Sequence, residues 1–393
     1  MKKRINSART PIYRDTGFEL SDAYLTYETF EKEKEHERDP ENFIYSRYRN
    51  PTVVAAEDEI MRLEGSKWAL LTQSGMSAID VALSIFQRGK ETRPWLFLSE
   101  IYGGTISFID SVLVQRRGLV IEWFLPENDS YDLSKLEDLI KRLRPEVIYM
   151  EVISNPMLIV APPDKIIDLA GKYKCKVLVD NTFATPLLCK PLDMGADMVI
   201  HSGTKYFGGH GNITAGAVCG NDPDRMKEAI AYRKFVGHML SADDAYRLHT
   251  QIQSFELRFT QQCRNAVLIA DILNSSSLVN KVWFPGLDSH KTHVEARSLF
   301  GNNGYGAMIT FDFAGTSNDE KRRLRDSFIG AVSEKIKLIP TLGDSHTILL
   351  PVESVWGHKY KEPGMIRLSI GFENSDELIA SVNAGLEKTV KAH

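Results

Sequence analysis

The chain has 393 residues, of which 43% are hydrophobic and 25% charged, and its formal net charge is −4. This length allows two domains of ordinary size, and the composition is that of a globular protein. The small negative charge gives no electrostatic basis for binding nucleic acid or an anionic membrane, and no apolar run reaches the roughly 18 residues of a membrane span.

The N-terminal segment, residues 1–55, is polar, poorly periodic and rich in Tyr, Arg and Glu. It begins MKKRINSARTPIYRD, which lacks the apolar stretch of a secretory signal, so we do not expect one. The run from Glu31 to Asp39 alternates in sign, which is typical of a solvated helix face or loop. The segment therefore predicts an arm that needs another surface to hold it.

Residues 56–245 alternate short apolar runs with amphipathic stretches such as Leu133–Leu143 and Pro163–Lys172. The apolar runs include Trp95–Leu98, Leu119–Trp123, Val147–Met150, Lys176–Val179 and Met198–Ile200. This alternation is typical of βαβ units, so we expect a large α/β domain with a mostly parallel sheet flanked by helices. In such sheets ligands collect at the carboxyl ends of the strands, which makes those ends the candidate functional site.

Residues 246–393 have a different pattern, which predicts a smaller α+β domain. A long helical stretch, about Asp243–Leu273, leads into an alternating strand at Gly304–Gly315. A helix is expected at about Asp319–Ser333, and the final strand, MIRLSIGF, precedes a last helix. We see no internal repeat and no low-complexity tract.

The four cysteines are scattered and none has CxxC spacing. They are Cys175, Cys189, Cys219 and Cys263. A zinc site or a disulfide framework is therefore not expected, and the pattern fits a reducing, cytoplasmic compartment.

The first strand end with unusual chemistry is Ser74-Gly75-Met76, which lies between an apolar run and a helical pattern. Backbone N–H groups at a helix start point outward at the positive end of the helix dipole and can bind a phosphate. An ordinary N-cap explains the same residues, and on this segment alone it is the stronger interpretation.

Two more strand ends carry polar residues. Glu151 and Asn155 follow one apolar run, and Pro156 stops it, so a plain turn explains them well. Asp180 follows another apolar run, where a carboxylate is costly unless it is paired. A protonated pyridine nitrogen would supply that partner, and a capping or structural role is an equal alternative.

The fourth strand end is the stretch HSGTKYFGGHGN, which contains Ser202, Thr204 and Lys205. A Schiff-base lysine needs a depressed pKa and a fixed position, and burial beside other cations gives both. The two hydroxyls are natural phosphate ligands. The glycines lack GxGxxG order, and His210 has no second ligand at metal-binding spacing.

These motifs together resemble the Cys/Met-metabolism (trans-sulfuration) family of fold-type I enzymes that use pyridoxal phosphate (PLP). The resemblance runs from TPIYRDTGF to RLSIGFEN, and HSGTKYFGGHGN is its most specific part. It implies that Lys205 carries the cofactor. It also implies that Ser202 and Thr204 bind the phosphate, helped by the backbone at Gly75 and Met76.

Other motifs of the family match further residues. YSRYRNPT resembles the motif that reaches a neighbouring subunit's phosphate, which points to Tyr45 and Arg47 and implies a dimer at least, commonly within a tetramer. YGGT implies that Tyr102 stacks on the cofactor ring and assists proton transfer. Asn155 matches the asparagine near the ring hydroxyl, and Asp180 matches the aspartate at the ring nitrogen.

The substrate end of the resemblance is less regular. Arg367 matches the arginine that clamps the substrate α-carboxylate, with Thr341 and Asn155 beside it as expected substrate-binding residues. Thr341 replaces the family's usual serine, His346 replaces a frequent glutamate, and residues 356–367 form a shorter loop than is common. The segment Gln251–Arg258 also departs from the family pattern.

The resemblance implies elimination or replacement at the β- or γ-carbon of a sulfur amino acid, with an amino acid as the small-molecule substrate. Activity of the cystathionine γ-synthase or γ-lyase type is preferred. Methionine γ-lyase, cystathionine β-lyase and O-acylhomoserine sulfhydrylase are the alternatives, and Gly103 leans away from the first of these because a cysteine is common there. Transamination or decarboxylation on the same fold, and cofactor binding without turnover, stay open as other classes.

Overall fold

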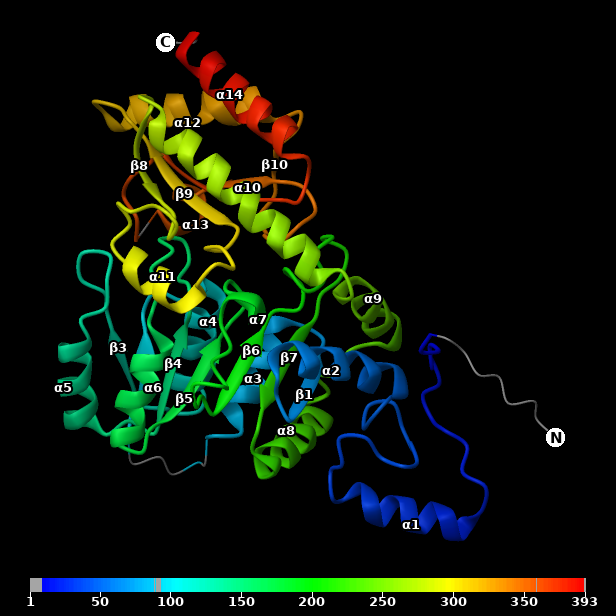
Figure 1. The fold of residues 1–393 in the computed structure, drawn as a ribbon. Coiled ribbons are helices and arrows are strands. Elements are labelled where there is room, and N and C mark those ends of the chain that lie inside the picture. Colours follow the sequence, from blue (N-terminus) through cyan, green and yellow to red (C-terminus); the bar gives the residue numbers. More distant parts are fainter. Residues whose placement is uncertain (1–8, 88, 90–92, 358, 392–393) are drawn as a thin grey trace.

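The computed structural model describes the chain except residues 1–8, 88, 90–92, 358 and 392–393. It contains two β-sheets, one above the other in Figure 1, and an N-terminal arm at the side. The α/β architecture with a mostly parallel sheet and a second, smaller sheet confirms the fold predicted from the sequence. No helix among the described residues is long and apolar enough to cross a membrane.

The larger sheet has seven strands in the order β1-β7-β6-β5-β4-β2-β3. Its strands are β1 (Trp68–Thr72), β2 (Trp95–Leu98), β3 (Ile121–Phe124), β4 (Val147–Glu151), β5 (Lys176–Asp180), β6 (Met198–His201) and β7 (Gly216–Gly220). Strands β2 to β6 pair in parallel, whereas β7 is antiparallel to both β1 and β6. Because β4 and β5 pair in parallel with Glu151 opposite Asp180, the two carboxylates lie side by side at the carboxyl edge.

Helices lie on both faces of this sheet (Figure 1). They are α2 (Pro51–Glu64), α3 (Gly75–Ser84), α4 (Gly103–Phe108), the π-helical turn η1 (Ile109–Val114), α5 (Leu133–Leu143), α6 (Pro163–Lys172), α7 (Thr185–Leu188) and α8 (Pro223–Val236). The predicted bounds of α5 and α6 agree with the structure. In each case a continuous apolar face buries against the sheet, as with Leu136 and Ile140 of α5.

The smaller sheet has five strands in the order β10-β11-β12-β9-β8. Its elements are β8 (Val279–Trp283), α11 (His293–Phe300), β9 (Met308–Phe313), α12 (Asn318–Val332), β10 (Lys337–Leu338), β11 (Ile348–Pro351), α13 (Glu353–Trp356), β12 (Met365–Ser369) and α14 (Ser375–Lys391). The strand expected at Gly304–Gly315 is shorter than predicted, and all six residues of β9 are buried. On one face Phe311 and Phe313 pack on Phe328 of α12. On the other, Thr310 donates a hydrogen bond to the carbonyl of Pro156 in the larger domain, so neither face is left to solvent.

The long helix expected at about Asp243–Leu273 is two helices, α9 (Ala242–Ile252) and α10 (Phe255–Ser275). The helix breaks at Gln253 and Ser254, because α9 packs on α2 of the large sheet whereas α10 packs on β8, β9 and α14 of the small one. We retain residues 1–55, 56–245 and 246–393 as the proposed division of the chain.

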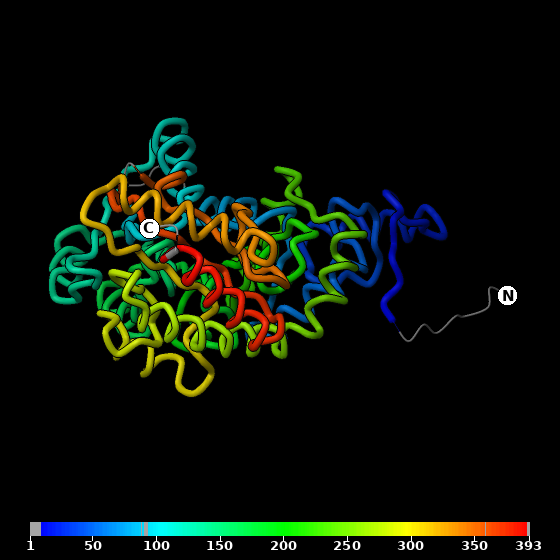
Figure 2. Tube along the Cα trace, turned by 90° about the horizontal axis from the view of Figure 1, so that it is seen from above, coloured from blue at the N-terminus to red at the C-terminus, as the bar shows by residue number. Residues whose placement is uncertain are grey.

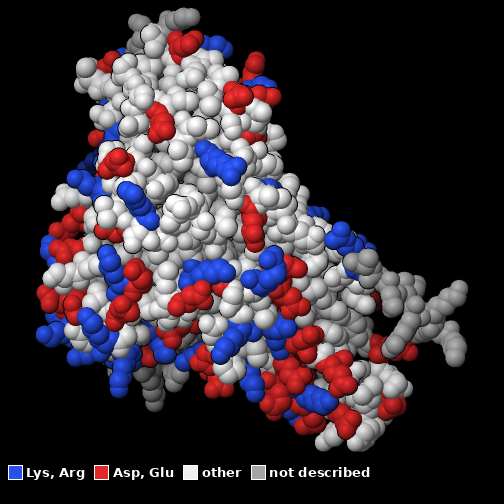
Figure 3. All heavy atoms as spheres, in the orientation of Figure 1, with Lys and Arg blue, Asp and Glu red and all other residues white. Residues whose placement is uncertain are grey.

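In the described part of the N-terminal arm, helix α1 (Ala23–Glu33) precedes α2, and its N-cap Asp22 accepts a hydrogen bond from the N–H of Leu25. Both ribbon views place α1 on the side away from β3 and α5 (Figures 1 and 2). Tyr24 and Tyr27 are 71% and 66% exposed, so this helix covers little of its own chain. The first eight residues of the predicted arm lie outside the described part. On the face shown in Figure 3, acidic and basic side chains are interspersed over the large domain.

Candidate active site

A cavity of about 330 Å³ lies at the carboxyl edge of the large sheet, and residues of the small sheet close it from the other side. The predicted site residues that line it are Gly75, Met76, Tyr102, Asn155, Asp180, Ser202, Thr204, Lys205, Thr341 and Arg367. Two sheets far apart in sequence therefore gather one set of polar groups around one space.

Lys205 follows β6 in a turn, and its side chain reaches into the cavity. Its Nζ donates a hydrogen bond of 2.8 Å to Oγ1 of Thr341, which belongs to the small domain. Burial and, as the second cause, the guanidinium of Arg367 together lower the pKa of Lys205 to about 8. A far larger fraction of this amine is therefore neutral near physiological pH than in an ordinary lysine, and the neutral form is what a nucleophile or proton acceptor requires.

Gly343 brings the small domain against the lysine backbone. Its φ is +77°, and a Cβ on this residue would lie 2.8 Å from the carbonyl carbon of Lys205. The N–H of Gly343 donates to Oγ of Ser369 at 2.8 Å. Only glycine combines this left-handed backbone with this close approach.

Asp180 ends β5 at the floor of the cavity, next to Glu151 of β4. Burial raises the pKa of Asp180, although the backbone N–H of Thr182, which donates at 2.9 Å, favours its ionised form. Burial also raises the pKa of Glu151 well above its ordinary value, and the Asp180 charge adds to this. Within the described residues neither carboxylate forms an ion pair with Lys or Arg.

The N-terminus of α3 meets the loop before Lys205. Ser74 caps the helix by accepting the N–H of Ser77. A Cβ on Gly75 would lie 2.9 Å from Oγ of Ser202, so the two segments are as close as a glycine allows. The hydroxyl of Ser202 has no hydrogen bond to any described residue, whereas Thr204 donates to the carbonyl of Ala215 and accepts its N–H. The helix N–H groups and a free hydroxyl thus face one position, which suits an anion.

Arg367 of β12 forms the opposite wall and is only 4% exposed. Its guanidinium donates to Oδ1 of Asn155 at 2.9 Å and to the carbonyl of Thr341 at 3.1 Å. Its buried Nε has no hydrogen-bond partner among the described residues. The ring of Trp356 lies 5.3 Å from its Cζ, so the arginine is held in place while retaining a free donor.

Residues 1–387 match the family model described as Cys/Met metabolism PLP-dependent enzyme. The chain belongs to this family. It is therefore a PLP-dependent enzyme of sulfur amino acid metabolism, with PLP as its cofactor, as predicted from the sequence.

Relatives in this family are similar over most of their length. A cystathionine beta-lyase of Lactococcus lactis subsp. cremoris (strain MG1363) is 34% identical over 361 residues, which cover 89% of this chain and 90% of the relative. An L-methionine gamma-lyase of Fusobacterium nucleatum subsp. polymorphum is 31% identical and covers 99% and 95%. The crystal structure of metB from Corynebacterium glutamicum superposes with a TM-score of 0.84 at 29% identity, covering 98% of this chain and 94% of that one.

The side chains in the cavity fit PLP on their own chemistry. The buried carboxylate of Asp180 lacks a cation, which a protonated ring nitrogen supplies. The free Ser202 hydroxyl and the α3 N-terminus suit a phosphate, and Lys205 has the depressed pKa needed to attach an aldehyde. One cavity thus holds a matching group for each end of the cofactor.

Tyr45 and Arg47, which the family resemblance assigned to a neighbouring subunit, do not line the cavity of their own chain. Arg47 donates to the carbonyl of Lys234 at 2.6 Å and lies over the rings of Tyr45 and Tyr48. His346 is exposed and hydrogen-bonds to Oγ of Ser345 rather than facing the cavity.

The sequence interpretation assigned no role to three residues of the site. Thr182 binds Asp180 through its backbone N–H, and its hydroxyl accepts the N–H of Ser202 at 2.8 Å, which fixes one strand end relative to the next. Glu151 accepts the N–H of Tyr102 at 2.6 Å and so fixes the start of α4. Trp356 had no local signal, because its role follows only from the position of β12.

Proposed function

We propose that this enzyme is a carbon–sulfur lyase that releases the sulfur substituent of an amino acid by elimination, with activity of the cystathionine γ-lyase type. The observation that carries the proposal is the Lys205 amine, which has a pKa of about 8, contacts Thr341 and lines the same cavity as Asp180 and Arg367, and so supports its role as a proton acceptor. The relatives at 30% identity or more that support elimination include the lyases of Lactococcus lactis, Fusobacterium nucleatum and Bacillus subtilis.

PLP, when bound, supplies an electron sink that accepts the electron pair released as a bond to the substrate's α-carbon breaks. Lys205 holds the cofactor at rest and, once the substrate amine has displaced it, accepts the proton of the α-carbon. Asp180 would keep the ring nitrogen protonated, and Asn155 would bind the ring hydroxyl. Loss of a γ-substituent needs a second proton to leave the β-carbon, and Lys205 can act as the base for that step only after it has given up the α-proton and is neutral again.

The phosphate is held by the backbone N–H groups of Gly75 and Met76 at the start of α3 and by the hydroxyl of Ser202. The hydroxyl of Thr204 donates a hydrogen bond to the carbonyl of Ala215, so Thr204 contributes mainly by fixing the shape of the loop. Tyr45 and Arg47 complete the phosphate site of a second copy. We therefore propose a homo-oligomer, at least a dimer and in the fuller form a tetramer, in which arms are exchanged.

Arg367 binds the substrate α-carboxylate, with its free Nε available for the second bond of a fork. Asn155 holds the guanidinium from one side, and Trp356 packs on it from the other. Tyr102, which is 49% exposed at the cavity mouth, is the acid that protonates the departing sulfur. Four buried free cysteines support the proposal of a cytoplasmic, reducing location.

Product analysis tests the reaction. The holoenzyme is incubated separately with cystathionine, methionine and homocysteine, and with O-acylhomoserine plus cysteine. Ammonia and 2-oxobutanoate without an added thiol are expected, and cysteine is the second product from cystathionine. Pyruvate and homocysteine from cystathionine would identify a β-lyase instead, and cystathionine formed from the acylhomoserine would identify a synthase. Absence of any keto acid and of any thioether product would contradict the proposal.

A further inference from the structure

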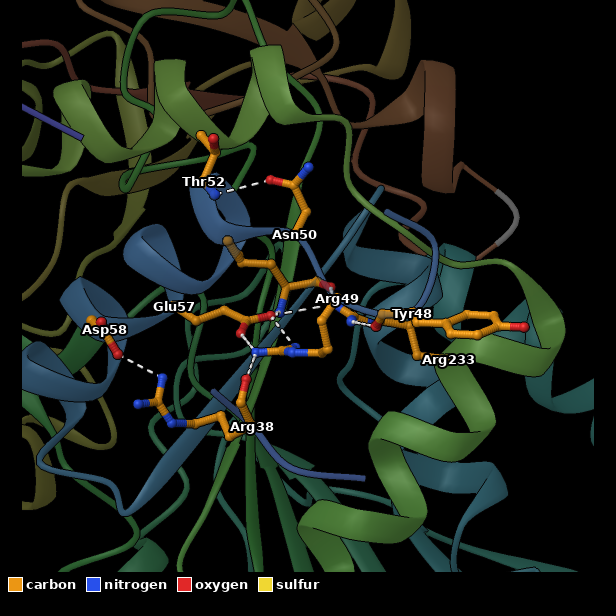
Figure 4. A network of polar contacts seen from close by, with 9 residues as sticks. Arg38, Tyr48, Arg49, Asn50, Thr52, Glu57, Asp58 and Arg233 are labelled. Atoms are coloured by element: carbon orange, nitrogen blue, oxygen red, sulfur yellow. Dashed lines mark hydrogen bonds and ion pairs between the residues drawn. The ribbon is translucent and has the colours of Figure 1, made fainter. Parts of the chain in front are cut away.

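Three charged side chains are buried together beneath the arm, outside the cavity. Glu57 of α2 is fully buried and lies between Arg49 and Arg233, which are 5% and 0% exposed (Figure 4). Arg49 donates to Oε2 of Glu57 at 2.5 Å, and Nη1 of Arg233 donates to Oε1 at 3.3 Å. We call Arg49, Glu57 and Arg233 the Glu57 cluster.

One side of the cluster holds strand β1. Oε1 of Glu57 accepts the N–H of Leu71 at 2.9 Å, and Nη1 of Arg233 donates to the carbonyl of Leu71 at 3.0 Å. Both backbone groups of this residue are therefore fixed by the cluster. Leu71 precedes Ser74 by three positions, and Ser74 caps the helix whose N-terminus faces the phosphate position. By fixing the end of β1, the cluster thus helps to fix the position of the N-terminus of α3.

The other side of the cluster holds the turn that contains Arg47. Nη2 of Arg233 donates a hydrogen bond to the carbonyl of Tyr48 at 3.0 Å, and both residues are labelled in Figure 4. The N–H groups of Tyr48 and Arg49 both donate to the carbonyl of Tyr45, at 2.8 and 3.2 Å. Arg47 binds the carbonyl of Lys234, the neighbour of Arg233. The direction in which the turn presents Arg47 therefore depends on the cluster.

The charges make Glu57 the indispensable member. Two guanidinium groups share one carboxylate, and burial together with the charge of Arg49 lowers the pKa of Arg233 to about 9 while Glu57 opposes this. Without the carboxylate charge, two buried cations would repel each other in a site that excludes water. Arg233 lies within helix α8, whereas Arg49 lies in the arm outside any helix or strand, so the carboxylate of Glu57 joins the arm to the large domain.

We propose that Glu57 is a positioning residue that couples two phosphate-binding elements, the α3 N-terminus of its own subunit and the arm that serves a second copy. The proposal rests on the proposed role of Tyr45 and Arg47 at the phosphate of a second copy. It assigns to one carboxylate the relative placement of the elements that hold PLP in two neighbouring sites.

The test uses the full-length apoenzyme and measures the dissociation constant of PLP by spectroscopic titration. In Glu57→Gln we expect PLP to bind roughly 2- to 30-fold more weakly, the range for a residue in a coupling network. Arg49→Met removes only the arm side and leaves the Glu57–Arg233 pair, so a smaller loss in the same direction is expected. If Glu57→Gln does not fold, Arg49→Met still tests the proposal. Arg47→Ala is measured beside them as the reference for the arm's own contribution.

Hydrogen exchange gives a readout that a general loss of stability would not reproduce. In Arg49→Met only the amides of residues 38–49 should exchange faster. In Glu57→Gln the amides of residues 68–76 should exchange faster as well. Two controls on α2 separate this from destabilisation. Glu59→Gln makes the same chemical change at an exposed ion pair with Arg62, and Ile60→Val lowers core stability without touching the cluster. Both should leave PLP affinity unchanged.

The outcomes separate the two proposals. If Arg47→Ala weakens PLP binding but neither Glu57→Gln nor Arg49→Met does, the coupling role of Glu57 is wrong and the role of the arm stands. If Arg47→Ala has no effect on PLP affinity, the arm does not serve the phosphate, and the inference about Glu57 falls with it. If Ile60→Val weakens PLP binding as much as Glu57→Gln at equal loss of thermal stability, the effect is structural and the coupling role is excluded.

Discussion

Arg367 donates a hydrogen bond of 2.9 Å to Asn155, a residue 212 positions earlier in the chain that lies in the turn after β4 of the larger sheet. The group that we propose for the substrate carboxylate is therefore oriented by the large domain. Lys205 and Thr341 repeat the relationship in the opposite direction, since the lysine that we propose for the cofactor donates a hydrogen bond to a residue of the small domain. Neither half of the molecule contains a complete site.

Replacing the lysine tests the central assignment. Lys205→Ala should abolish the visible absorbance of the lysine-bound cofactor and lower kcat by roughly 10²–10⁴-fold, the contribution of a positioned acid–base group. Lys141→Ala on the exposed face of α5 is the control and should leave both unchanged. A purified wild-type protein without that absorbance after PLP addition would contradict the role of Lys205.

The attachment of PLP should depend on pH through the same amine. Only neutral Lys205 attacks the aldehyde, so the association rate of PLP with apoenzyme should rise with pH and level off above a pKa of about 8. Arg367→Met removes a positive neighbour that lowers this pKa, so the midpoint should move to higher pH. Stopped-flow measurements of the association rate in wild type and in Arg367→Met check both midpoints. A range of pH 6–10 extends roughly two units below and above the expected pKa. A midpoint that moves down in Arg367→Met would be incompatible with the charge argument.

Asp180→Asn should change activity and stability in opposite directions. Loss of the partner of the ring nitrogen should lower kcat by roughly 10²-fold or more. Because burial raises the folded-state pKa of Asp180, its charge destabilises the apoenzyme at neutral pH, so the variant apoenzyme should be more stable by about 1 kcal/mol. The gain should fade as the pH falls from the raised folded-state pKa of Asp180 to the ordinary pKa of the carboxyl, below which both states are protonated. Thermal unfolding of the apoenzymes at two pH values measures it, and equal destabilisation at both would refute the reasoning.

Trp356 is expected to act through Arg367. Trp356→Ala removes the ring over the guanidinium and should raise KM for the amino acid by roughly 2- to 30-fold, the range of a cation–π contact, with a smaller change in kcat. Trp356→Phe keeps an aromatic face and should recover most of the affinity. A fall in kcat with KM unchanged would instead place Trp356 in the chemical step.

The sequence predicts those site residues that directly follow a buried strand. Asp180 and Lys205 stand out because a charge after a continuous apolar run needs a partner, and the α3 cap stands out because Ser-Gly precedes a helical pattern. Most of the fold follows from the same alternation of runs. The sequence does not predict how the two domains are arranged. Thr341 and Trp356 line the cavity because β11 pairs with β12 in the smaller sheet, and no local pattern indicates that pairing.

Other features depend on tertiary structure that local patterns do not carry. The break at Gln253 and Ser254 has no glycine or proline to indicate it, and it arises because α9 packs on α2 of the large domain whereas α10 packs on β8, β9 and α14 of the small domain. The buried charge of Glu57 sits in an ordinary amphipathic helix pattern, and its partners come from 8 and 176 residues away. The places of Tyr45 and Arg47 in a second copy stay predictions, as does the identity of the sulfur substrate.

Gly343, with its φ of +77° against the Lys205 backbone, bears on any attempt to redesign substrate choice. In a random library of the segment that contains Thr341, most variants would be inactive if position 343 were included. Holding Gly343 constant while varying Thr341 samples the cavity wall and keeps the backbone of the lysine in place. A residue that has no side chain thus limits which positions of this segment can be varied.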